Sequence, residues 1–217
     1  MEITKTHHES GTGIYTMSQQ VETKEQWSDA EKIASEMTEW MNTTNGHFGG
    51  EFSKAFAMAH CQVVEHDHPI KLFVVDKELV VPKGKVPAGR NNLANTFFEA
   101  QAIFNCEVLD APDKVTTKVP QRKVERKGLK AEVKMEMVER EMPNEVTYPE
   151  GCMSFPHRAQ RNVQRKYRIK VRYQWLSKGL LGGRKVETFE GWVEGLKAHI
   201  IQHETDHFIG KNIHFGS

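Results

Sequence analysis

The chain has 217 residues, of which 38% are hydrophobic and 27% charged, and its formal net charge is +1. A chain of this length buries about 70% of its unfolded surface, so one domain spanning 1–217 can fold without disulfides or a structural metal. The near-zero charge excludes a molecule-wide field that attracts nucleic acid, and no DNA partner is expected. No apolar run reaches the length of a membrane span, so no membrane association is predicted.

The three cysteines, Cys61, Cys106 and Cys152, form an odd and sparse set. Such a set differs from a disulfide framework and is typical of proteins in a reducing compartment. The first residues also lack the apolar segment of a signal peptide. The sequence therefore predicts a cytoplasmic protein with a cysteine thiolate available to bind metal.

The N-terminal half of the chain combines one helical pattern with two strand patterns. Residues 1–22 are polar and aperiodic, which predicts an extended start. From Trp27 to Met41 apolar residues recur every three or four positions, as in an amphipathic helix packed on a core. Residues 70–75 and 102–109 are predicted to be strands.

The segment 114–140 is densely charged and has only scattered apolar residues. Charged and apolar residues alternate from 130 to 140, which suits a half-exposed strand, and Gly128 is placed to turn a hairpin. The basic run 122–127 could contact RNA, but acidic residues are mixed into it and no aromatic platform is present. A charged, solvated hairpin insertion is therefore the favoured interpretation.

The C-terminal third alternates between a shaped loop, strands and a helix. Two prolines and a glycine mark the segment 148–156 as a non-helical loop around Cys152. Residues 167–175 and 185–192 alternate as strands, and a glycine pair at 182–183 joins them as a hairpin. The whole pattern predicts an α+β fold in which antiparallel strands surround a C-terminal helix.

That C-terminal helix carries the sequence H-E-x-x-H at 203–207. Residues four apart lie on one face of a helix, so His203 and His207 can bind the same metal ion. Glu204 then lies beside the ion, where a carboxylate can accept a proton from water. By itself the pattern also fits a helix with two histidines on a solvated face.

A catalytic metal on this motif needs a third protein ligand and an open position for water. A third histidine shortly after the motif is missing, because His214 lies in the wrong register. The upstream candidates are Cys152, Cys61, His60, His66 and His68. Cys152 stands out because the prolines and the glycine around it restrict its loop.

Two motifs resemble those of one known family. The segment Glu150-Gly151-Cys152-Met153-Ser154 resembles the E-G-C-[LM]-S motif of peptide deformylases, and residues 202–207 resemble their Q-H-E-x-D-H motif. Both motifs in this order and at this separation are a specific signature, and the resemblance extends from about residue 24 to residue 213. It implies a deformylase-like fold.

The resemblance is incomplete at the family's first motif, G-φ-G-φ-A-A-x-Q. Gln62 is kept in the matching segment, but Ala55 and Ala57 replace both glycines and His60 replaces an alanine. These changes put the affinity for substrate in question more than the chemistry. The chain also ends ten residues after His207, which resembles the trimmed form of some bacteriophage members.

The resemblance implies a metal-dependent hydrolase that removes the N-formyl group from the N-formylmethionine of newly made polypeptides. It assigns the metal to three residues: Cys152, His203 and His207. It implies Glu204 as the base, and Gln62 with the backbone N–H of Met153 as donors to the oxyanion. It also implies Fe²⁺ in the cell, replaceable by Zn²⁺, Ni²⁺ or Co²⁺. The expected partners are the formylated N-termini of nascent polypeptides, and the ribosome is a further candidate.

The methionine side chain of such a substrate needs an apolar slot near the metal. The candidates for this pocket are Phe56, Met58, Leu196, His199 and Ile200. Glu150 and Asp206 are expected to orient the ligands, Asp206 by pairing with an arginine such as Arg165. A plain structural salt bridge is the equal alternative for both carboxylates.

Two other functions stay open at this point. A zinc peptidase would use the same H-E-x-x-H motif, but it needs His, Asp or Glu as third ligand and does not explain residues 150–154. A degenerate relative would bind metal or formyl peptide without turnover, and only the altered motif at 55–62 favours it. Deformylation is preferred because it accounts for both specific motifs.

Overall fold

The computed structural model describes residues 17–44, 55–63, 68–81, 97–127, 130–152, 154, 159–179 and 183–214, with side chains omitted at 44, 124–127 and 130–132. The helices are α2 (Lys24–Thr44) and α3 (Gly195–Phe208), with short 3₁₀ turns η1 (His60–Gln62) and η2 (Lys77–Leu79). The strands are β1 (Ala57–Ala59), β2 (Leu72–Val75), β3 (Ala102–Asp110), β4 (Lys114–Lys127), β5 (Lys130–Pro143), β6 (Val146–Glu150), β7 (Arg161–Arg165), β8 (Arg168–Lys178) and β9 (Arg184–Glu194). The predicted extended start at 1–22 lies mostly outside the described residues.

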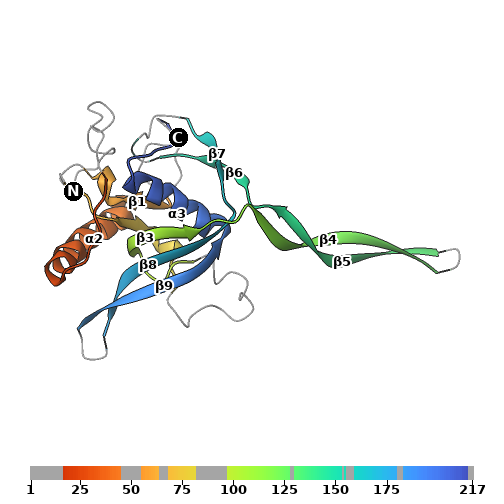
Figure 1. The fold of residues 1–217 in the computed structure, drawn as a ribbon, viewed down its shortest axis with the longest axis horizontal. Helices are drawn as coiled ribbons and strands as arrows, with labels where there is room; N and C mark the ends of the chain where they lie inside the picture. The colour runs from red at the N-terminus through yellow and green to blue at the C-terminus, as the bar shows by residue number, and fades with distance from the viewer. Residues whose placement is uncertain are drawn as a thin grey trace.

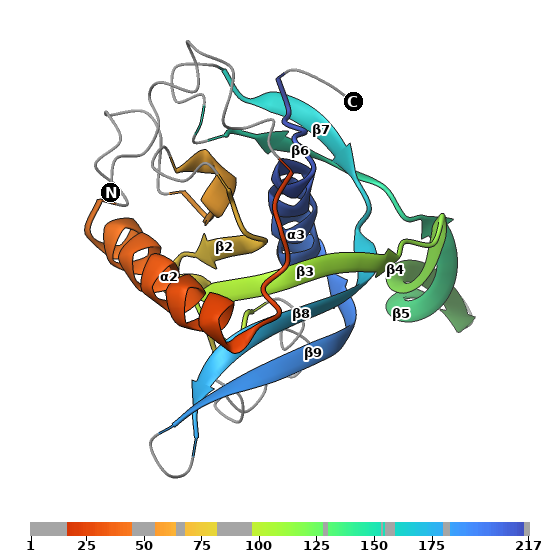
Figure 2. The same cartoon turned by 60° about the vertical axis from the view of Figure 1, so that its left-hand side comes forward.

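An antiparallel five-stranded sheet in the order β1-β2-β3-β8-β9 forms the centre of the molecule (Figure 1). Side chains alternate across a sheet, and β2 shows this clearly. Leu72 and Val74 pack with α2, whereas Phe73 and Val75 pack with α3. The two helices therefore cover opposite faces of the sheet (Figure 2). This arrangement confirms the predicted α+β fold around a C-terminal helix.

The predicted amphipathic helix is α2, and its apolar positions explain its place on the sheet. Ala30, Ala34, Met37 and Met41 are buried at spacings of four, three and four residues. This spacing puts them on one helical face. That face packs on Phe104 and neighbouring sheet residues.

The predicted hairpin of the C-terminal third is β8–β9, paired without interruption from Arg168↔Glu194 to Lys178↔Arg184. At its end the chain passes directly into α3. Gly195 has a φ of 59°, a left-handed conformation that suits glycine. The hairpin therefore delivers the motif helix across the sheet.

The first turn of α3 contains a fully buried lysine that the sequence patterns did not reveal. The Nζ of Lys197 donates to the carbonyl of Phe97 at 2.8 Å and to the Tyr173 hydroxyl at 2.7 Å, and Glu99 lies 3.6 Å away. The ammonium also lies over the Phe98 ring, 4.9 Å from its centroid. Burial lowers the pKa of Lys197, although Glu99 opposes this effect. These contacts fix the start of the helix on the sheet.

The charged segment of the sequence forms a long two-stranded ribbon, β4–β5, here called the arm. Its strands pair from Lys114↔Pro143 to Lys127↔Lys130, and the arm projects away from the body (Figure 1). The expected turn residue, Gly128, lies outside the described residues. At the base, the buried Asn144 side chain donates to the carbonyls of Pro112 and Arg168 and accepts from the Arg168 N–H. The chain therefore enters and leaves the arm at one fixed point.

In the part of the chain that the structure describes, no helix is long and apolar enough to span a membrane.

Candidate metal centre

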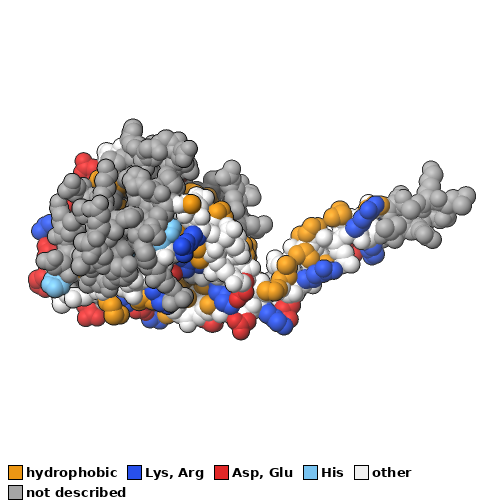
Figure 3. All heavy atoms as spheres, turned by 90° about the horizontal axis from the view of Figure 1, so that it is seen from above, with side chains coloured by type: hydrophobic (Ala, Val, Ile, Leu, Met, Phe, Trp, Pro, Cys, Tyr) orange, Lys and Arg blue, Asp and Glu red, His pale blue; other side chains and the backbone are white. Residues whose placement is uncertain are grey.

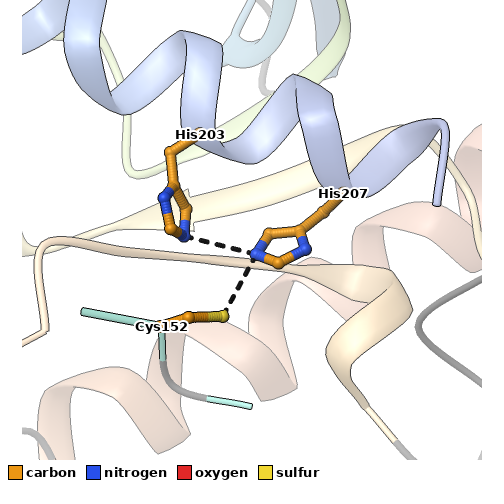
Figure 4. Close-up of side chains that lie close together, drawn as sticks. All are labelled: Cys152, His203 and His207. Atoms are coloured by element: carbon orange, nitrogen blue, oxygen red, sulfur yellow. Dashed lines mark hydrogen bonds between the residues drawn. The ribbon is translucent and has the colours of Figure 1, made fainter. Parts of the chain in front are cut away.

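Three side chains from two distant parts of the sequence converge beside α3. His203 and His207 stand one turn apart on the helix, and Cys152 lies two residues after the end of β6. The Nε2 atoms of the two histidines are 3.3 Å apart, and the Cys152 Sγ lies 3.4 Å from the His207 Nε2. Figure 4 shows the three side chains pointing toward one another. All three are buried or nearly so.

These spacings fit a tetrahedral metal ion. Typical bonds to zinc are about 2.0–2.1 Å for imidazole nitrogen and 2.3 Å for thiolate sulfur. Tetrahedral angles then separate two nitrogens by about 3.4 Å and a nitrogen from a sulfur by about 3.5 Å. Two of the three donor pairs have nearly these separations, and all three donor atoms lie within 4.8 Å of one another. Two imidazoles and a thiolate also leave one position of a tetrahedron open, as a catalytic site requires.

The electrostatics of the cluster favour a cation at the same point. Burial opposes ionisation of Cys152, but His207 and His203 outweigh it and lower the pKa of the thiol well below its ordinary value. Burial likewise opposes protonation of His203, but Cys152 and Glu150 raise its pKa well above the ordinary value. The same thiol and imidazole groups favour a bound metal ion, because metal ligands are deprotonated.

Glu150, the last residue of β6, contacts the proposed ligand His203 and the neighbouring His199. Its carboxylate contacts the His203 Nδ1 at 2.8 Å and the His199 Nε2 at 3.0 Å. Because a carboxylate accepts hydrogen bonds, the proton of His203 lies on Nδ1 and Nε2 is left for metal. Burial alone would raise the pKa of Glu150, but hydrogen bonds from His199, His203 and Arg165 lower it below the ordinary range.

Arg165 on β7 joins this carboxylate to a second one on the motif helix. Its Nε donates to Glu150 at 2.7 Å, and its NH1 group donates to Asp206. The pairing of Asp206 with Arg165 is therefore observed. The chain of contacts from Asp206 through Arg165 and Glu150 to His203 links α3 with the β6–β7 ribbon.

Glu204 is only 3% exposed, and its Oε2 has no hydrogen-bond partner among the described residues. Burial raises the pKa of its carboxyl; the charges of His203 and His207 oppose this shift, and Cys152 adds to it. A buried carboxylate with an open oxygen beside a metal cluster can accept a proton from a reacting molecule. A purely structural carboxylate at this depth would have its oxygens paired.

The Gln62 side chain is held in one orientation by its neighbours. The backbone N–H of Ala59 donates to its Oε1 at 2.8 Å, which fixes the amide oxygen on that side. Its Nε2 therefore faces the metal cluster, where it donates to the Ser154 Oγ at 2.9 Å and lies 3.6 Å from the Cys152 Sγ. The amide presents a donor next to the ligands. Met153, the other expected oxyanion donor, lies outside the described residues.

The five residues predicted for the methionine pocket occupy different environments. Met58 packs in the core under α2, and Ile200 packs in the core under α3. Leu196 is partly buried against the α3 core, and Phe56 is 53% exposed. His199 contacts Glu150 and meets the Tyr148 ring edge-on, at 4.5 Å between centroids. Their role in a pocket stays a prediction.

Sequence reasoning missed one neighbour of the cluster, Ser154. Ser154 is 1% exposed and accepts a hydrogen bond from the Gln62 amide; its place in the motif at 150–154 was the available signal.

His60 and Cys61, both candidates for the third ligand, have other contacts. The His60 Nδ1 accepts the Ile70 N–H at 3.0 Å, and the Cys61 Sγ lies 3.5 Å from the carbonyl of His207. Neither belongs to the cluster formed by the described residues.

A cysteine and two histidines that converge beside a buried glutamate define a metal-dependent hydrolase. The family model described as "Polypeptide deformylase" matches residues 1–214. The chain belongs to this family, and the function of the family is deformylation of polypeptides by a metal-dependent enzyme.

The chain is similar to several solved peptide deformylases, and one of them, with a TM-score of 0.50, shares the fold. The Arabidopsis thaliana enzyme 1B, in complex with an inhibitor, is 17% identical with a TM-score of 0.50, over 98% of this chain and 78% of that one. The Thermotoga maritima enzyme is 24% identical with a TM-score of 0.49, over 94% and 90% of the two chains. A class I type b enzyme from Acinetobacter baumannii is 20% identical with a TM-score of 0.49, over 93% and 91%. None of the curated protein sequences matches the chain.

Proposed function

We propose that Cys152, His203 and His207 hold the metal ion of this deformylase, and that the substrate is the N-formylmethionine of newly made polypeptides. The observation that carries the proposal is the convergence of the three donor atoms within 4.8 Å of one another. A divalent ion bound there supplies Lewis acidity, which allows water to attack a formamide at neutral pH. We assign Fe²⁺ as the physiological ion on the family resemblance, with Zn²⁺, Ni²⁺ or Co²⁺ as substitutes. Softness of the ligands also suits zinc.

Glu204 is the proposed acid and base of the reaction. Its carboxylate accepts a proton from the attacking water and donates it to the leaving nitrogen as the C–N bond of the formamide breaks. The products are formate and a free amino terminus, so atoms and charge balance. The raised pKa of Glu204 supports both roles, because a group closer to neutrality can accept and return a proton.

The Nε2 of Gln62 and the backbone N–H of Met153 are the proposed donors to the oxyanion. The fixed orientation of the Gln62 amide supports this assignment, since preorganised donors stabilise developing charge without reorganisation. We propose Phe56, Met58, Leu196, His199 and Ile200 as candidates for the methionine pocket. Glu150, Asp206 and Arg165 are proposed to orient the ligands through the contact to His203.

The test is hydrolysis of a formyl-methionyl peptide by anaerobically prepared, iron-loaded protein, with formate as the readout. We expect rapid formate release that falls about 10²–10⁴-fold in Glu204→Ala. Metal content should be unchanged in the variant. The matched control is Glu190→Ala on the exposed side of β9, which should keep full activity. Formate release by Glu204→Ala at the wild-type rate would remove Glu204 from the mechanism.

A degenerate binder is the second candidate, because Ala55 and Ala57 stand where the family motif has glycines. It predicts tight binding of the formyl peptide with no formate, even with stoichiometric iron. A zinc peptidase predicts internal cleavage of unformylated peptides and retention of metal in Cys152→Ala. The same preparation distinguishes all three outcomes.

We further propose that residues 1–217 act as one cytoplasmic catalytic unit that meets its substrate at the ribosome. The described cysteines are all free thiols, which supports a reducing compartment. Co-sedimentation with translating ribosomes tests the last point. Protein that stays in the supernatant at physiological salt would contradict it.

A further inference from the structure

One face of the arm exposes apolar side chains to solvent. Strand alternation and the register put Pro120 beside Met137 and Arg122 beside Met135 on the same face. Met135 is 65% exposed, Met137 59% and Val133 48%. Figure 3 shows hydrophobic and basic side chains side by side along the arm. We call these five residues the arm face.

An isolated two-stranded ribbon is marginally stable in water, and it normally needs packing on one face. Within the described chain, β4 and β5 pack extensively only on each other. Methionine and arginine are enriched in protein interfaces, and the flexible methionine adapts to irregular apolar surfaces. The arm face therefore has the composition of a docking surface for protein.

A surface of complementary character lies on the body of the same chain. An open groove of about 580 Å³ runs between α2 and the sheet, with Ala34, Phe104 and Leu176 among its apolar lining residues. Glu39 lies on its rim and makes no salt bridge within the described residues. Helix α2 contains two lysines and five acidic residues, whereas the arm sequence 114–143 contains nine basic and five acidic residues. The groove itself is lined by Glu39 and by the Glu31–Arg184 ion pair, and the arm face carries Arg122, so the two surfaces have net charges of opposite sign and both include apolar side chains.

We propose that the chain forms a two-fold dimer in which the arm face of each copy lies in the α2 groove of the other. The arm and α2 lie at opposite ends of the molecule, so an arm does not reach its own groove (Figure 1). Fourteen residues of strand span about 46 Å, and a compact body of this size is roughly 40 Å across. An arm can therefore run the length of a neighbouring body. Reciprocal exchange forms the contact twice and closes the assembly.

RNA fits the arm face less well than a second copy does. Glu139 lies on this face beside Lys118 in the strand register, and exposed methionines do not bind phosphate. The dimer is also independent of the deformylase chemistry, because no residue of the arm face touches the metal cluster. A failure of one proposal therefore leaves the other intact.

The experiment is sedimentation velocity of the full chain over a wide concentration range, at low and high salt. We expect a dimer that weakens with salt. Met135→Glu should weaken self-association about tenfold or more. The control Thr117→Glu adds the same charge to the opposite face, across from Arg140, and should leave the dimer intact. Thermal unfolding that matches the wild type in both variants shows that each is folded.

A mixing experiment tests the groove. Glu39→Arg should also weaken the dimer, because it reverses the rim charge. Met135→Glu keeps an intact groove and Glu39→Arg keeps an intact arm, so their mixture should recover one of the two contacts and associate more tightly than either alone. A mixture no tighter than its components would overturn the groove and point to arm-on-arm packing. A wild-type chain that stays monomeric throughout, with or without added RNA, or that shifts only with RNA, would overturn the dimer.

Discussion

Proteins usually bury apolar side chains and expose charged ones. The metal centre departs from this rule by burying charged groups, and the arm departs from it by exposing apolar ones. At the metal centre, charged groups such as Glu150 and Glu204 are buried at 3% exposure. On the arm, Met135 and Met137 are mostly exposed. Glu150 is held by several partners and Glu204 keeps one oxygen unpaired among the described residues, whereas the exposed methionines have little to pack against within the described chain. The comparison teaches that catalysis requires polar groups to be desolvated and fixed, whereas recognition requires apolar groups to stay available.

The effect on the free energy of unfolding also differs between the two regions. A buried charge that loses its partner destabilises a protein by about 3–5 kcal/mol, because desolvation is no longer compensated. An exposed methionine contributes almost nothing to the free energy of unfolding until a partner covers it. Substitutions in the two regions should therefore have very different effects, which the following predictions test in order of size.

The largest effect is expected for Cys152→Ala, which removes the thiolate ligand. We expect the variant to lose stoichiometric metal and to fall in activity by on the order of 10⁶-fold, toward the uncatalysed rate. Elemental analysis and formate release measure the two effects. The matched control is Cys106→Ala, which removes another buried thiol, on β3 and outside the metal cluster, and should keep its metal. Full metal content in Cys152→Ala would refute the ligand set.

Gln62→Met should reduce kcat by about 10²–10³-fold, because a fixed oxyanion donor typically contributes about 2.7–4 kcal/mol. KM should change little, since the donor acts in the transition state. Steady-state kinetics with a formyl-methionyl peptide separate the two constants. A rise in KM with kcat preserved would instead assign Gln62 to substrate binding. Thermal unfolding checks that the lost contact to Ala59 has not disrupted the fold.

Glu150→Gln should destabilise the fold by about 3 kcal/mol at neutral pH, because Arg165 and the histidines lose a buried charge. The pKa of Glu150 is lowered in the folded state, so its contribution is present above the ordinary carboxyl value of 4.5 and is lost as pH falls below it. The stability gap between wild type and variant should therefore narrow in acid. Urea unfolding across this range measures the gap. Glu145→Gln, an exposed change just before the same strand, should show no such gap.

The smallest effect is expected when the arm is shortened. Replacing residues 116–141 by Asn-Gly joins the paired residues Val115 and Met142 through a two-residue turn. We expect the free energy of unfolding to change by about 0.5 kcal/mol or less, and kcat/KM on a short formyl peptide to stay unchanged. A large loss of stability would show that the arm supports the body, and would remove the contrast between the two regions.

The sequence predicted the elements whose pattern is local. The helical spacing before Met41, the alternation in β8 and β9, and the four-residue spacing of His203 and His207 each follow from the geometry of one element. Cys152 emerged because its motif is specific. The fold class followed from the order of these elements, and the structure confirms it.

The features that the sequence did not predict depend on contacts between segments far apart in the chain. Nothing local to Glu150 shows that its carboxylate joins two histidines and an arginine, since those partners come from β7 and α3. From the sequence alone, Lys197 is expected to lie on the surface of the helix. In the structure it is buried against Tyr173 and Glu99. Helical spacing put His199 among the pocket candidates, but spacing cannot reveal that its ring meets a carboxylate. The spacing of apolar and polar residues along the sequence does not reveal such tertiary networks.

The asparagine at the base of the arm bears on how related chains can diverge in evolution. Asn144 fixes the entry and exit of the ribbon on Pro112 and Arg168, so everything beyond it can lengthen, shrink or diverge without disturbing the strands of the body. We expect related chains to differ in the length and sequence of this ribbon far more than in its base. The same position is a natural graft point, where a foreign ribbon could be attached to a working catalyst.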